Sequence, residues 1–100
     1  MATATKTLFR GAASTSSTTL YTVPSSTTTV ITNIGVTNTS SSTQSYTLSF
    51  NGVIFADTVS IAAKDTVVID LKQIVVATNT ITGLASATSV NFHISGVEIS

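Results

Sequence analysis

The sequence predicts an all-β protein, a single-domain antiparallel β-sandwich with either jelly-roll or immunoglobulin-like connectivity. Apolar and polar residues alternate with a period of two in several segments, which is typical of strands with one buried face. Turn-forming residues separate these segments at short intervals, and no segment has the apolar spacing of an amphipathic helix. The 100 residues suit one domain, and no linker divides residues 1–100.

The N-terminal part begins with a predicted strand at residues 3–9. A loop of small and hydroxyl residues follows it, and we expect residues 1–18 to form a first strand and loop that could act as an arm. The next two strands are predicted at 19–23 and 27–37, because Pro24 and the serines after it interrupt the β-branched pattern.

The clearest local signal is the segment around residues 44–53. Tyr46, Leu48 and Phe50 alternate with polar residues and predict a strand at 44–50. Asn51-Gly52 then supplies the positive φ angles of a two-residue type I′ turn. The sequence therefore predicts a β-hairpin here.

This hairpin has consequences for its side chains. A two-residue turn places Phe50 opposite Val53 and Leu48 opposite Phe55, so we expect all four on the core face. Ile54 falls on the other face and is a candidate exposed apolar contact.

Further strands are expected along the C-terminal half, some of them merging across bends: residues 53–56, 58–61, 66–71, 74–77, 79–83 and 88–99. Val67, Ile69 and Leu71 share one face of the 66–71 strand. Near the C-terminus the alternation changes phase at Gly96. A bulge there would return Val97 and Ile99 to the core.

Charged residues are scarce. They make up 8% of the chain, the formal net charge at pH 7 is zero, and there are 15 serines and 21 threonines. Because the bases are few and scattered, we expect no binding to nucleic acid. No apolar run reaches the ~18 residues of a membrane helix, so we expect no membrane contact. An exterior of hydroxyl and methyl groups with little repulsion favours association with other protein.

The residue types needed for chemistry are sparse. The chain has one histidine and no cysteine, which excludes disulfides, suits a cytosolic folding compartment and leaves no ligand set for zinc. His93 could act as a base for Ser95, but side chains two apart on a strand do not favour a direct bond. Asp57, Asp65 and Asp70 border expected turns or strand ends, where aspartate satisfies nearby backbone donors. We therefore expect no enzymatic activity, no catalytic or metal-binding residues and no cofactor.

Two further polar features have ordinary explanations. Asn38-Thr39-Ser40 matches a glycosylation acceptor, but without a secretory signal it indicates a polar loop. Tyr21 and Tyr46 are the aromatic residues best suited to stacking on a sugar, yet both fall inside strand patterns and are expected to be half-buried.

Several short motifs together resemble small all-β structural proteins of tailed bacteriophages. In chain order they are KTLFRG at 6–11, TLYTVP at 19–24, NTS at 38–40, NG at 51–52, SIAAKDT at 60–66 and ISGVEIS at 94–100. The resemblance covers nearly the whole chain. It implies a β-sandwich that self-associates and attaches to a phage particle, and it implies no catalytic residues.

The resulting hypothesis is a non-enzymatic virion protein made in the bacterial host cytoplasm. The primary form is a capsid decoration (cement) protein that stabilises the major capsid shell. Its expected partners are further copies of itself, as a dimer or trimer, and the phage major capsid protein or other virion proteins. The alternative is a tail, fibre or baseplate module that binds a host-surface glycan or connects tail components.

Overall fold

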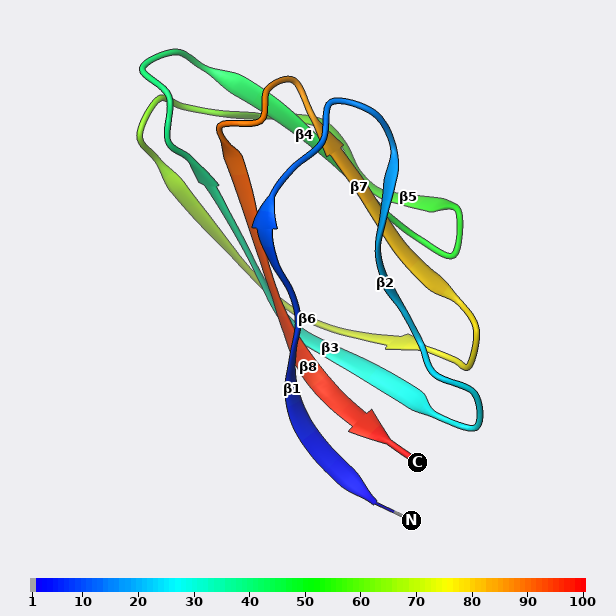
Figure 1. Cartoon of the computed structure of the whole chain (residues 1–100). Helices are drawn as coiled ribbons and strands as arrows, with labels where there is room; N and C mark the ends of the chain where they lie inside the picture. Colours follow the sequence, from blue (N-terminus) through cyan, green and yellow to red (C-terminus); the bar gives the residue numbers. More distant parts are fainter. Residues whose placement is uncertain (1) are drawn as a thin grey trace.

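A computed structural model describes residues 2–100 and shows eight strands (Figure 1). Met1 lies outside the described residues. The strands are β1 (Thr3–Ala12), β2 (Thr18–Thr22), β3 (Thr28–Asn38), β4 (Gln44–Phe50), β5 (Val53–Ile61), β6 (Thr66–Val75), β7 (Thr80–Ala85) and β8 (Val90–Ile99). In this part of the chain, no helix is long and apolar enough to cross a membrane.

The strands form two four-stranded antiparallel sheets, in the orders β1-β8-β3-β6 and β2-β7-β4-β5. This confirms the predicted all-β sandwich. The first strand pairs with the last, β2 with β7, β3 with β6 and β4 with β5. Such nested pairing, divided between two sheets, is the connectivity of a jelly roll rather than an immunoglobulin fold.

Eight strands replace the ten short ones expected from the sequence. The segments 53–56 and 58–61 form one strand, β5, which continues through Thr58 in spite of its positive φ of 49°. The segments 66–71 and 74–77 likewise merge into β6, which ends at Val75. In both places the neighbouring strand, β4 for β5 and β3 for β6, continues past the point where the apolar alternation is interrupted.

The core lies between the sheets and consists of the inward faces that the alternation predicts. β8 contributes Val90, Phe92 and Ile94, all with no exposed surface. Leu48 from β4 and Ile81 from β7 are equally buried in the opposite sheet. Burying such side chains stabilises the fold by about 1.5–3 kcal/mol each relative to exposure.

β1 forms an edge of the first sheet. It pairs with β8 of the same chain from Thr3 to Ala12, so the start of β1 lies beside the end of β8 (Figure 1). Ala2 and Ser100 extend the pairing, with backbone hydrogen bonds of 2.8 Å in both directions. The role of residues 1–18 as an arm remains a prediction.

The predicted hairpin is present, but its register changes after one step. Asn51 and Gly52 have φ angles of 50° and 77°, and Phe50 faces Val53 as expected. Leu48, however, pairs with Ala56 instead of Phe55, because the register shifts between Leu48 and Ser49.

The expectation that Val53 and Phe55 are buried in the core is wrong. Val53 is 70% exposed and Phe55 is 38% exposed. β5 is the last strand of its sheet, so no further strand extends the sheet to cover these side chains. Ile54 is exposed, as predicted.

The expectation of a bulge at Gly96 is also wrong. The extra residues lie in the two neighbouring strands, at Leu8 of β1 and Thr32 of β3. Gly96 itself is buried, and a Cβ atom on it would lie 2.4 Å from the carbonyl oxygen of Val30. Glycine is needed here because the β3 backbone passes so close.

Candidate assembly surface

His93, which the sequence offers as a possible base for Ser95, lies on the same strand as that serine, β8. His93 is exposed on β8, where its register partners are Arg10 of β1 and Gly35 of β3. Within residues 2–100, no hydrogen bond joins the His93 imidazole to Ser95, and no group of three or more His, Cys, Asp or Glu side chains lies close enough to hold a metal ion.

The three aspartates each have a nearby hydrogen-bond donor. Asp65 accepts a bond of 2.9 Å from the backbone N–H of Thr66, as predicted for a turn residue. The other two lie inside strands rather than at their ends, and both are bonded to side chains. Asp57 accepts a bond from the Thr58 hydroxyl, and Asp70 accepts one from the Asn33 amide across the β3–β6 pair.

The two tyrosines considered for sugar stacking are buried more completely than expected. Tyr46 is 3% exposed, and its ring packs edge-on against Phe92 with centroids 6.3 Å apart. Tyr21 is 9% exposed. Neither ring has a face open to a ligand.

Tyr21 instead connects the two sheets through a polar cluster. From β2 its hydroxyl reaches the Thr29 hydroxyl at 2.9 Å and donates a hydrogen bond to the Glu98 carboxylate. The same carboxylate pairs with Lys6 at 3.4 Å. Burial, and then the hydrogen bond to Glu98, raise the pKa of Tyr21 above its ordinary value. Sequence spacing could not reveal this cluster, because its members come from four different strands.

Asn38, the potential glycosylation acceptor, is a buried structural residue with no exposed surface. Its amide nitrogen donates to the carbonyl oxygens of Ser42 at 2.8 Å, Ile61 at 3.1 Å and Ala62 at 3.2 Å. Its side-chain oxygen accepts bonds from the backbone and hydroxyl of Ser40. Asn38 therefore holds the 39–43 loop against the end of β5, and its nitrogen is not available for modification in the folded chain.

Exposed apolar side chains gather on β5, on β6 and just after β6. These two strands are the last in their respective sheets, and each has a free edge in the described part of the chain. The large apolar residues concerned are Val53, Ile54, Phe55, Val59, Val68, Ile74 and Val76.

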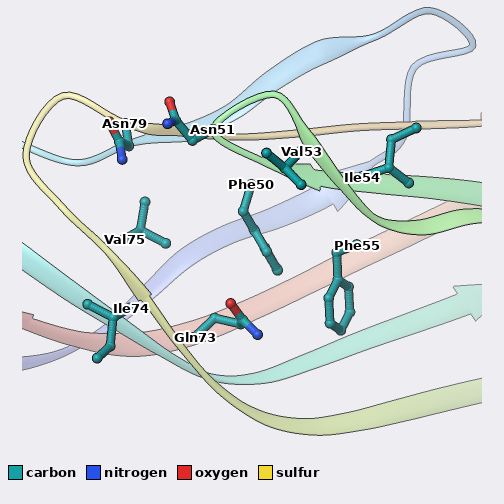
Figure 2. Close-up of a pocket in the computed structure, with 9 residues that line it drawn as sticks. All are labelled: Phe50, Asn51, Val53, Ile54, Phe55, Gln73, Ile74, Val75 and Asn79. Atoms are coloured by element: carbon teal, nitrogen blue, oxygen red, sulfur yellow. The ribbon is translucent and has the colours of Figure 1, made fainter.

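Between the β4–β5 hairpin and the end of β6, this side of the sandwich contains an open hollow of about 280 Å³ (Figure 2). Phe50 and Phe55 point from the hairpin toward β6, and their ring centroids lie 5.0 Å apart. Ile54 points away from the rings. The lining also includes the amide side chains of three residues: Asn51, Gln73 and Asn79.

This side of the molecule also carries little charge. β5 contains one charged residue, Asp57, and β6 contains two of opposite sign, Asp70 and Lys72. Unpaired strand edges, exposed apolar side chains and weak electrostatic repulsion together favour contact with another protein. We call the exposed residues of β5 and β6 the edge surface.

Comparison with known proteins adds no assignment: no family model matches the chain, and no match to a curated protein is found.

Proposed function

We propose that this protein is a non-enzymatic structural component of a bacteriophage virion, acting as a capsid decoration protein that stabilises the major capsid shell. The observation that carries the proposal is the edge surface, which leaves Val53, Ile54, Val68 and Ile74 each more than half exposed. Isolated domains usually protect strand edges with charge or cover. The resemblance of the ordered sequence motifs to phage structural proteins supplies the phage context.

Attachment to a shell would suit such a surface. An icosahedral shell repeats each docking site many times, so a symmetric dimer or trimer of this chain binds through several contacts at once. Each contact can then be modest. The partners in this proposal are copies of the same chain and the major capsid protein.

The test uses purified shells that lack the protein. Adding the full chain should give stoichiometric decoration, hundreds of copies per shell, and should raise the temperature at which shells open. Ile54→Ser should weaken decoration, because Ile54 is exposed and opposes only Ser49 within the sheet. Thr22→Ser, on the edge strand β2, is the control. Shells that neither bind the chain nor gain stability would refute the proposal.

A second candidate is a tail, fibre or baseplate module that binds a host-surface glycan. The hollow favours it, since the Phe50 and Phe55 rings lie near the amides of Asn51, Gln73 and Asn79, and aromatic rings beside a few placed polar groups are typical of small-molecule sites. Jelly rolls occur among both capsid proteins and lectins, so the fold does not choose between the two. A dozen or fewer copies per purified particle, together with saturable binding on a glycan array, would favour this candidate.

A further inference from the structure

The four sheet edges differ in how well they could pair with another strand. β2 has five residues. β5 is interrupted by two register shifts and by the positive φ of Thr58. β1 carries two bases, Lys6 and Arg10, and no acid. β6 has ten residues and a single register shift against β3, where Leu71 and Lys72 lie opposite Thr32. The exposed side chains of Val68, Asp70, Lys72 and Ile74 lie on its outer face.

The outer face of β6 is self-complementary. Read in either direction, it runs apolar, charged, charged, apolar, with the two charges opposite in sign. Two β6 strands pairing antiparallel around a two-fold axis at Leu71 would place Asp70 opposite Lys72 of the second copy, twice. The same register places Val68 opposite Ile74, also twice, and these are 62% and 69% exposed in the single chain.

Neighbouring registers lose this match. In a strand pair related by a two-fold axis, residues on one face pair only with residues on the same face. Each possible register therefore has its axis centred on one residue of β6, and the neighbouring registers are centred on Asp70 and on Lys72. Centring it on Asp70 places two acids opposite each other, and centring it on Lys72 does the same with two bases. Like charges directly opposite destabilise a strand pair. A lone edge lysine normally discourages pairing, whereas here Asp70 compensates it in one register.

We infer that β6 is a self-association edge, at which a second copy of this chain binds antiparallel around Leu71. The β1-β8-β3-β6 sheet then continues across the axis as one eight-stranded sheet. This deepens the proposed function, on which its biological role rests, because it names the self-contact of the decorating oligomer. The hairpin end of the edge surface remains open to the shell.

The decisive experiment reverses charges in the full-length chain and measures mass by sedimentation equilibrium. Wild-type protein should form a dimer of twice the 10.2 kDa chain. Asp70→Lys places like charges opposite at both positions and should weaken dimerisation about tenfold. Adding Lys72→Asp to that variant restores opposite charges and should restore the dimer. Asp57→Lys changes net charge equally but lies on β5, so it should have no effect; circular dichroism verifies folding of each variant.

A cross-link tests the register directly, since the chain has no cysteine of its own. In the inferred register the two copies of residue 71 face each other at about 4.5–5.5 Å between Cα atoms, within the range of a disulfide. Leu71→Cys should therefore form a covalent dimer under mild oxidation, and Val68→Cys, which faces Ile74, should not. A monomer at all concentrations, or equal cross-linking at both positions, would overturn the inference.

The two proposals can fail separately. If the chain is monomeric in solution but still decorates shells, the β6 inference is wrong and the shell function stands. If the charge-reversal series behaves as expected but shells are not bound, the dimer stands and the capsid function is wrong.

Discussion

Replacing Asn38 by aspartate should destabilise the fold strongly and in a pH-dependent way. The substitution keeps the side chain's size, so it creates no cavity. It does replace an N–H donor with a second acceptor, facing the carbonyl oxygens of Ser42, Ile61 and Ala62. Since carbonyl oxygens only accept hydrogen bonds, nothing around that oxygen compensates an ionised carboxylate.

The magnitude follows from the burial of the site. Asn38 has no exposed surface, and an uncompensated buried charge typically costs about 3–5 kcal/mol. For a domain of this size, about 4 kcal/mol corresponds to a decrease in Tm of roughly 20 °C. Asn38→Ala loses the same bonds without burying a charge, and water can reach the more exposed carbonyl groups. Its cost should be about 2 kcal/mol.

The pH dependence separates the two variants. Burial and the facing carbonyl groups should raise the pKa of the new carboxyl in the folded state above the ~3.9 of an unfolded chain. A raised folded-state pKa means that the folded form is favoured at low pH and loses stability as pH rises through that pKa. Asn38→Asp should therefore approach Asn38→Ala in stability as the pH is lowered from 7 toward 4.

Urea denaturation of both variants and the wild type at pH 4, 5.5 and 7 measures this difference. Subtracting the alanine variant at each pH removes the titration of the other carboxylates. Equal stability of the two variants at pH 7, with no change on acidification, would refute the assigned role of the Asn38 amide.

Three further outcomes are expected. Tyr21→Phe removes the hydrogen bonds to Thr29 and Glu98 and should lower the free energy of unfolding, measured by urea denaturation, by about 2 kcal/mol. An unchanged denaturation midpoint would argue against the cross-sheet contact. The pKa of Tyr21 is raised in the folded state, so the stabilising contribution of Tyr21 is complete below pH ~10 and is lost as the pH rises further. The wild type should therefore lose more stability between pH 9.5 and 11 than Tyr21→Phe does. Gly96→Ala should lower the free energy of unfolding by about 3 kcal/mol, because the new Cβ would lie 2.4 Å from a backbone oxygen. Gly11→Ala, where no atom lies nearer than 3.5 Å to the new Cβ, should be nearly neutral. Similar Tm values for the two variants would contradict the close packing at Gly96.

Local sequence was a good guide where each residue's environment depends on its own strand. The alternation of Val90, Phe92 and Ile94 predicted an inward face that is fully buried. Asn51-Gly52 predicted the hairpin turn, because few other pairs adopt two positive φ angles at low cost. The exposure of Ile54 followed from the same register.

The predictions that failed depend on neighbouring strands. Phe55 was expected inside because its parity matches the core, but β5 is an edge strand and its inward side stays partly open. β8 itself has no extra residue at Gly96, and the register shifts there arise from extra residues in β1 and β3. A sequence pattern records that a register changes, but it does not record which partner carries the additional residue.

By itself, the sequence determined that the chain is all-β, which faces of most strands are apolar and that few charges oppose association, since these follow from residue type and spacing of two. Only the tertiary structure decided which strands end the sheets, and hence which apolar faces remain exposed. It also brought Tyr21 to Glu98 and enclosed Asn38 among backbone carbonyl groups. These contacts join residues far apart in the chain, and their positions are set by strand order, which local spacing does not encode.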